Sequence, residues 1–255
     1  MPSLDWNKAV WDGEYDWDQQ GDEWSGAWGG AGMQWQFMLL PRIQAFLPAA
    51  TILEIAPGFG RWTRHLKDHC QKLIAVDFAE KCIERCRERF RGVSHIEYHV
   101  NDGRSLPMVA DRSVDFAFSF DSLVHVDFAV VETYIGELGR VLAPNGAAVL
   151  HHSNLGEYLP QVRDKFETEK KWHHRGTDVT AAKVEAAAVA AGLQCCGQEL
   201  VNWGITPELT DGVSLFARPG SLFARPNRVV RNPEFMADAA RIRRLGEVYG
   251  AFAGG

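Results

Sequence analysis

Three histidines and one aspartate directly follow segments that read as strands. Asp121 and His125 come after the apolar run 114–120, and His151 and His152 come after the apolar run 147–150. Histidine titrates near neutral pH, so a histidine in a cleft can take the proton from a hydroxyl group. We expect His125 to be the general base, with His151 or His152 second, because neighbours on a strand point to opposite faces. Asp121 would orient a histidine or bind the molecule that carries this hydroxyl group.

The same four side chains allow two other interpretations. Asp121, His125, His151 and His152 could ligate a divalent metal, and a set so rich in imidazole suits Zn, Fe or Ni better than Mg²⁺. His125 could instead cap or pack at the start of the following helix. Three histidines at adjacent strand ends favour catalysis, and we do not favour a metal.

These groups need a scaffold, and a glycine turn at residues 56–60 indicates which one. Ile52 to Ile55 suit a strand that is buried on both faces, while Gly58 and Gly60 let a ligand approach the backbone. A helical pattern follows, so free N–H groups would face the loop. Thr63 stands where a dinucleotide fingerprint has its third glycine, and no GK[ST] forms a phosphate-binding loop.

An acidic residue ends the next apolar run, 73–76. Asp77 is placed to accept both hydroxyls of a ribose, and Glu54 precedes the glycine turn. At this point the chain resembles the class I S-adenosylmethionine (SAM)-dependent methyltransferases, whose first motif is a strand ending in E/D-x-G-x-G-x-G. Ala56 and Pro57 depart from that motif, but Gly58 and Gly60 remain.

The resemblance implies a SAM cofactor and a set of residues that hold it. Asp102 would bind the adenine amino group and the backbone of Gly103 would face the ring, although Asp-Gly is also an ordinary turn. Residues 140–146 resemble the R-x-L-x-P-G-G connection before strand five. The implied cofactor-binding residues are Glu54, Ala56, Gly58, Gly60, Asp77, Phe78, Asp102, Gly103, Ser119 and Phe120.

The periodicity predicts one α/β domain: a Rossmann-like, seven-strand, mostly parallel sheet with helices on both faces. An amphipathic helix is expected over 33–47, strands over 95–100, 198–203 and 213–217, and helices over 80–91, 131–142 and 180–191. We divide the chain into an N-terminal arm and leading helix (1–50), the SAM-binding domain (51–218, with an insertion at about 155–177) and a C-terminal tail with a helix (219–255). The segment SLFARP occurs at 214–219 and again at 221–226, and only one copy can form the last strand.

Five tryptophans lie within residues 1–30, among acidic residues and glycines. So many indoles are costly to leave in water, so the segment should fold over the main domain. It would be either a passive packed arm or a lid that closes on cofactor and substrate. In the second case Trp24 and Trp28, together with Trp172 in the insertion, would contact the substrate.

Composition limits the partners. A formal net charge of −6 argues against binding nucleic acid, which needs a basic face. The five cysteines show no CxxC spacing, and the acidic start carries no signal-like apolar segment, so we expect a reducing cytoplasm. No apolar run approaches the length that crosses a bilayer, so no membrane insertion is expected. A small-molecule or glycan hydroxyl is the expected acceptor, and the oligomeric state is left open.

Three functions fit these residues. The first is O-methylation of a sugar or other small-molecule hydroxyl with a histidine base, because Ser122 to His125 resembles the S-L-H-H segment of sugar O-methyltransferases. The second is N-methylation of a small amine, which needs less help from a base. The third is a non-catalytic binding protein that keeps the fold, against which the retained glycines, Asp77 and Asp102 argue.

Overall fold

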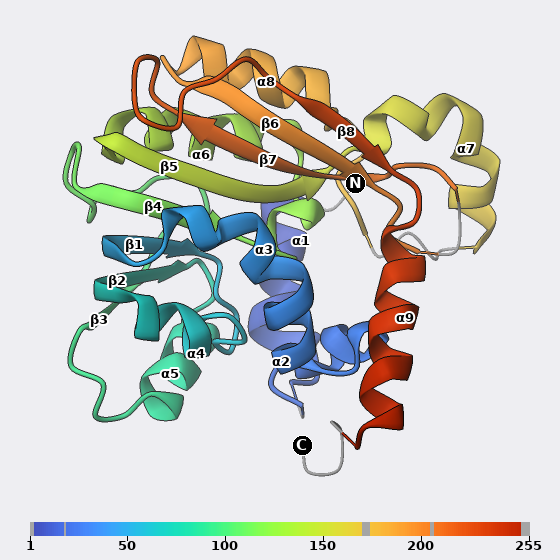
Figure 1. The fold of residues 1–255 in the computed structure, drawn as a ribbon, viewed down its shortest axis with the longest axis horizontal. Helices are drawn as coiled ribbons and strands as arrows, with labels where there is room; N and C mark the ends of the chain where they lie inside the picture. Colours follow the sequence, from blue (N-terminus) through green and yellow to red (C-terminus); the bar gives the residue numbers. More distant parts are fainter. Residues whose placement is uncertain (1–2, 18, 170–173, 205–206, 251–255) are drawn as a thin grey trace.

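The computed structural model describes residues 3–17, 19–169, 174–204 and 207–250. Its centre is one eight-stranded sheet with the order β3-β2-β1-β4-β5-β7-β6-β8 (Figure 1). The strands are β1 (Ala49–Ile55), β2 (Cys70–Asp77), β3 (Ile96–Val100), β4 (Val114–Ser119), β5 (Leu142–Ser153), β6 (Gln194–Val201), β7 (Asp211–Ala217) and β8 (Val229–Asn232).

The sheet is mostly parallel, as expected. Strands β1 to β5 pair in parallel, β7 is antiparallel to both β5 and β6, and β8 is parallel to β6. The Rossmann-like fold class is therefore confirmed, but with eight strands where the sequence predicted seven. The missed strand, β8, has only four residues, and three of them are exposed, so it shows no alternation of apolar and polar positions.

Helices cover both faces of the sheet. The helical segments are α1 (Leu4–Lys8), η1 (Ala9–Glu14), η2 (Asp22–Trp28), α2 (Ala31–Gln34), η3 (Trp35–Leu39), α3 (Leu40–Ile43), η4 (Gln44–Phe46), α4 (Thr63–Leu66), η5 (Lys67–His69), α5 (Glu80–Arg89), η6 (Leu123–His125), α6 (Phe128–Val141), α7 (Leu155–Glu169), α8 (Ala181–Ala190) and α9 (Phe235–Val248). The helix expected over 33–47 is thus one run of four short helical segments.

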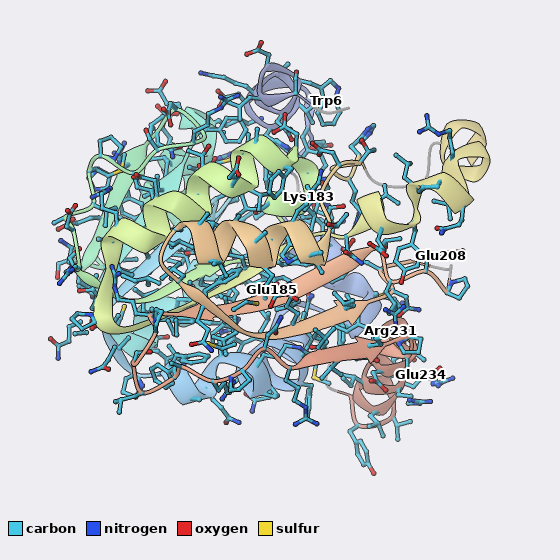
Figure 2. The ribbon with its side chains drawn as sticks, turned by 90° about the horizontal axis from the view of Figure 1, so that it is seen from above. Trp6, Lys183, Glu185, Glu208, Arg231 and Glu234 are labelled. Carbon is cyan, nitrogen blue, oxygen red and sulfur yellow. The ribbon has the colours of Figure 1, made fainter. Side chains whose placement is uncertain are left out.

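Strand alternation divides the core into two clusters. On β4, Ala117 faces a cluster with α6 and α8, whereas Phe116 and Phe118 face a cluster with α4, α5, α9 and the helical run 31–46. Figure 2 shows α8 from outside, with Lys183 and Glu185 on the helix that covers β6 and β7. Both sheet faces are therefore buried, and the ends of the strands are left for ligands.

The duplicated segment takes two different conformations. Residues 214–217 of the first copy lie in β7, between β5 and β6. The second copy, 221–226, forms a turn and an extended loop that leads into β8. The insertion predicted at 155–177 contains α7, which carries Pro160 inside the helix.

Candidate active site

A cavity lies at the carboxyl ends of β1, β2 and β4, where ligands bind in open α/β sheets. Each strand contributes the residues that follow it, and the N-terminal arm closes the side opposite the sheet. The lining residues are Leu4, Asn7, Trp11, Trp17, Gln20, Gly21, Trp24, Ala56, Pro57, Gly58, Phe59, Arg61, Trp62, Asp77, Phe78, Cys82, Gly103, Phe120, Asp121, Ser122, Leu123, His125, Val126 and Tyr134.

Asp77 is fixed at the end of β2 by two backbone donors. Its Oδ2 accepts the N–H of Gly58 at 3.1 Å and its Oδ1 accepts that of Ala79 at 2.9 Å. Burial raises the pKa of Asp77 to about 7, although these hydrogen bonds act in the opposite direction. A buried carboxylate in a cavity wall, with lone pairs left for hydroxyl donors, suits a ribose.

The two loop glycines do different work. A Cβ on Gly58 would lie 3.2 Å from Trp17, in the cavity wall, and the backbone there has φ +58°. A Cβ on Gly60 would lie 2.5 Å from Phe90, so this glycine makes room for packing against α5. Gly60 is not among the described residues that line the cavity. It allows the glycine loop to lie close to α5, and not to a ligand.

Glu54 and Ser119 lie behind the cavity wall rather than in it. Glu54 is 1% exposed and accepts a hydrogen bond from the Thr63 hydroxyl at 2.6 Å, while its second carboxyl oxygen has no described partner. Burial raises the pKa of Glu54 to about 8. Glu54 is therefore protonated at neutral pH, and it holds Thr63, the first residue of the helix that follows the glycine loop.

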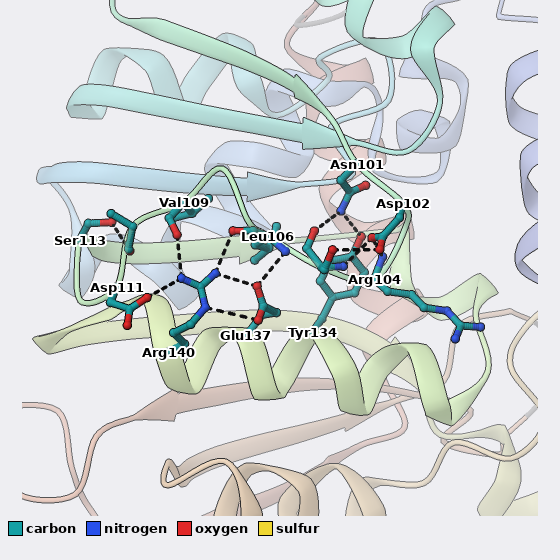
Figure 3. Close-up of polar contacts among 12 residues, drawn as sticks. Asn101, Asp102, Arg104, Leu106, Val109, Asp111, Ser113, Tyr134, Glu137 and Arg140 are labelled. Carbon is teal, nitrogen blue, oxygen red and sulfur yellow. Dashed lines mark hydrogen bonds and ion pairs between the residues drawn. The ribbon is translucent and has the colours of Figure 1, made fainter.

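Figure 3 shows how the loop after β3 is held. Arg140 on α6 donates to the carbonyls of Leu106 and Val109, each at 2.8 Å, and pairs with Glu137, which accepts the N–H of Leu106. Arg140, the first residue of the motif found by resemblance, therefore fastens the loop that contains Gly103 to α6.

Within this loop Gly103 lines the cavity and Asp102 does not. The Asp102 carboxylate is exposed and accepts hydrogen bonds from the backbone of Arg104 and from Ser105. Asn101 instead links the loop to the cavity, because its amide donates to the hydroxyl of Tyr134 at 3.0 Å and accepts the N–H of Gly103. In this conformation Asp102 stabilises the turn, and its contact with adenine stays a prediction.

Of the four candidate catalytic residues, Asp121 and His125 line the cavity. Burial, together with the positive charge of Arg175, lowers the pKa of His125 to about 3. Its Nδ1 has no described partner. Burial alone would raise the pKa of Asp121, but Arg61 and His151 outweigh it, so the pKa is lowered and the group stays ionised.

His151 and His152 are both fully buried and point to opposite sides, as strand geometry requires. His151 contacts Asp121 through Nδ1 at 3.2 Å, so it lies directly behind the cavity wall. His152 contacts the Ser214 hydroxyl at 2.7 Å and the carbonyl of Ser153, within the sheet core. Burial lowers the pKa of His152 to about 4, which suits a neutral packing residue.

Behind the cavity a chain of charged groups continues from these residues. Arg61 pairs with Asp121 at 2.6 Å, His151 bridges Asp121 and Asp211, and Arg175 pairs with Asp211 at 2.5 Å. All five residues are at most 6% exposed. The sequence did not predict Arg61, Arg175 or Asp211 as site residues, because single charged residues far apart in the chain carry no periodic signal. The position of Arg61 just after Gly60 was the available clue.

The arm covers the cavity, with Trp11, Trp17 and Trp24 in its wall. Trp17 stacks on Phe59 at 4.2 Å, and a Cβ on Gly103 would lie 3.0 Å from Leu4. Trp28 is 2% exposed and packs edge-on against Phe235 of α9, so the structure places it in the core rather than at the site. Trp172 lies outside the described residues.

Polar contacts tie the arm to the site at three places. The Asn7 amide donates to the carbonyl of His125 at 2.9 Å, and the Arg61 guanidinium donates to the Ser25 hydroxyl at 3.2 Å. Asp22 pairs with Arg64, on the helix that follows the glycine loop. Two further contacts hold the arm beside α5, because Asp12 accepts the N–H of Lys81 at 3.2 Å and Asp22 also lies 3.8 Å from Arg89.

Among the described residues, no group of three or more His, Cys, Asp or Glu side chains is arranged to hold a metal ion. Within the same residues, no helix is long and apolar enough to cross a membrane.

The residues present fit SAM. Asp77 offers carboxylate oxygens to ribose hydroxyls, Gly58 and Gly103 bring backbone to the cavity surface, and Phe78 and Phe120 add apolar walls. A family model described as a methyltransferase domain matches residues 52–146. The match covers the glycine turn, Asp77, the Gly103 loop and the Arg140 motif.

Residues 52–146 therefore form a class I SAM-dependent methyltransferase domain, with SAM as its cofactor. Over 158 residues the chain is 32% identical to the biotin biosynthesis bifunctional protein BioHC of Cellvibrio japonicus, covering 62% of this chain and 30% of that protein. It is 31% identical to nodulation protein S of Rhizobium tropici over 115 residues, covering 45% of this chain and 47% of that protein. The chain thus spans less than half the length of these curated relatives.

The fold also matches a solved structure with a bound product. This is the N-methyltransferase NodS from Bradyrhizobium japonicum in complex with S-adenosyl-L-homocysteine, with a TM-score of 0.53 and 21% identity. The match covers 71% of this chain and 83% of that one. At this identity the likeness concerns the fold.

Proposed function

We propose that this chain methylates a small amine. The observation that carries the proposal is that neither of the candidate catalytic groups lining the cavity is a base matched to neutral pH, while Asp77, whose pKa is about 7, is assigned to the ribose. His125 has a pKa of about 3, and Asp121 is paired with Arg61. A base is most effective when its pKa lies near the operating pH, so these groups suit a nucleophile that arrives neutral. An amine does so more readily than an alcohol.

The chain's own residues would orient such an acceptor. SAM supplies a methyl group on a positively charged sulfur, so the acceptor must present a lone pair in line. Asp121 stays ionised in the cavity wall and can accept an N–H of the amine. Trp11, Trp24 and Trp62 line the same cavity and give it apolar walls, which would help to hold the acceptor in one geometry.

One neighbour in fold acts on an acceptor of the same class, since the solved structure from Bradyrhizobium japonicum is that of an N-methyltransferase. The expected O-methylation of a sugar or glycan hydroxyl is the second candidate, because His125 does line the cavity and its Nδ1 has no described partner. A non-catalytic binding protein is the third, and any turnover removes it.

Transfer of labelled methyl from SAM to a panel of small amines and matched alcohols tests the proposal. We expect the amines to be methylated and the alcohols to react at least tenfold more slowly. Asp121→Asn should lower kcat/KM for amines while leaving SAM affinity nearly unchanged, because it removes an acceptor contact. Preference for the alcohols would overturn N-methylation in favour of the second candidate.

A further inference from the structure

We propose that the methyl acceptor also carries an acidic group, a carboxylate or a phosphate, and that Arg61 holds this group beside the reacting centre. The inference deepens the proposed function, since it names a second feature of the acceptor. It rests on the cavity wall and on the charges behind it. It can fail while N-methylation holds.

Arg61 is the one Lys or Arg among the described residues that line the cavity. Its side chain is 6% exposed, and its guanidinium lies 4.4 Å from the centre of the Trp62 ring and 5.6 Å from that of Trp24. A cation held between indole rings, away from water, attracts an anion far more strongly than a surface cation does. The cavity thus has one strong anion-binding position.

The guanidinium has donors to spare. It presents five N–H groups in a planar fork, a shape that matches carboxylate and phosphate oxygens. One nitrogen donates to Asp121 at 2.6 Å and another to the Ser25 hydroxyl at 3.2 Å. The Ser25 contact comes from the N-terminal arm and is neutral, so an acidic group would replace it with a stronger, charge-assisted bond.

The charges behind Arg61 do not cancel. Both ring nitrogens of His151 lie about 3 Å from a carboxylate oxygen: Nδ1 lies near Asp121, and Nε2 lies near Asp211. Two carboxylates at this distance favour the protonated, imidazolium form of His151. Arg61, Arg175 and protonated His151 then give three positive charges against two negative ones, an excess of one. A buried, uncompensated charge is costly, so an anion on the acceptor would complete the set.

A buried donor beside Arg61 also lacks a partner. Trp62 is 3% exposed and lines the cavity, and its indole N–H has no described hydrogen bond. Buried polar groups are nearly always satisfied, so an unpaired one calls for an explanation. An oxygen of the acidic group provides one. Next to it, the carboxylate of Asp121 is left to face the amine.

The test uses acceptors that differ in two features at once. Amino acids of increasing chain length are compared with their amides, hydroxy acids with their amides, and ethanolamine with its O-phosphate, all with the full chain and SAM. We expect kcat/KM to be at least tenfold higher for the acidic member of each active pair. The carboxylate and phosphate members show which anion is preferred. Equal rates for acids and amides would overturn the anion site, whereas a preference for hydroxy over amino compounds would overturn only N-methylation.

Variants assign the effect to Arg61. Arg61→Gln should bring the acid-to-amide ratio close to one. Trp62→Phe keeps an aromatic ring but removes the N–H, so it should reduce the ratio severalfold. Arg64→Gln is the matched control, because Arg64 also binds the arm, through Asp22, but does not line the cavity. It should keep the ratio of the parent. A similar loss in both arginine variants would mean that arm closure alone sets the preference.

A binding measurement needs no turnover. Protein loaded with S-adenosyl-L-homocysteine is titrated with propionate or inorganic phosphate at constant ionic strength, and tryptophan fluorescence is recorded. A saturable change is expected in the parent and in Arg64→Gln, and none in Arg61→Gln. No saturable change in the parent with either anion would refute the proposal.

Discussion

Replacement of Asp77 by asparagine should weaken SAM binding and abolish its pH dependence. Asp77 is 4% exposed, lines the cavity and is held by the N–H groups of Gly58 and Ala79. A charge-assisted hydrogen bond contributes about 1.5 to 3 kcal/mol, so losing it should raise the Kd roughly tenfold to a hundredfold. Asp68→Asn, at a side chain that is 67% exposed, is the control and should change nothing.

The sign of the pH effect follows from the raised pKa. In the free protein Asp77 has a pKa of about 7, so it is mostly protonated below neutral pH. Hydroxyl donors favour the carboxylate, so the bound state has a lower pKa and binding releases a proton. Affinity should therefore rise with pH by up to about tenfold per unit below pH 7 and level off above it. Calorimetry from pH 5.5 to 8.5 measures both effects. A pH-independent Kd in the parent, or an unchanged Kd in Asp77→Asn, would refute the ribose assignment.

Three further predictions follow from the site. Because His125 has a pKa of about 3, it stays neutral above pH 5 and adds no pH dependence there. For an amine acceptor, log kcat/KM should then rise about one unit per pH unit between pH 6 and 8.5, because only the unprotonated amine reacts. His125 acting as a base on an alcohol would give a flat profile. Arg140→Met should cost about 1 to 2 kcal/mol in denaturant unfolding and weaken SAM binding severalfold, because the Gly103 loop loses its anchor; unchanged SAM affinity would contradict this. Deleting residues 1–20 should reduce turnover more than the melting temperature, since the Trp28 contact with Phe235 remains, and Trp24 should become less accessible to quenchers when ligand binds; equal access would support a passive arm.

The sequence was most informative where the chain alternates on the two-residue period of a strand or places glycine in a sharp turn. The strand leading to Gly58, the second strand ending in Asp77 and the α/β class all follow from such local patterns. Strand β8 did not, because it is short, exposed and at the edge of the sheet. Trp28 was misplaced as well. Composition predicts that an indole is buried, but not whether it is buried against a ligand or against α9.

The network of charged side chains behind the cavity could not be predicted from the sequence. Asp211 begins β7 and reaches His151 because β5 and β7 are neighbours in the sheet. Arg175 lies in an irregular segment, which is held at the end of β5 by the hydrogen bond from the Ser153 hydroxyl to the Gly176 carbonyl. Pairing between strands that are distant in the chain decides which charges meet. The sequence could locate His151 at a strand end, but not the two carboxylates that determine its charge.

The backbone of Asp121 shows what this charged chain does for the site. Asp121 has φ +63°, a left-handed conformation that costs of order 1 kcal/mol or more for a residue other than glycine. Such strain persists only where the surroundings hold it. Arg61 holds one carboxyl oxygen, and the Nδ1 of His151 holds the other at 3.2 Å. Asp211 contacts His151, and Arg175 contacts Asp211. The direction in which Asp121 faces the acceptor is therefore set in part by two residues that do not contact Asp121.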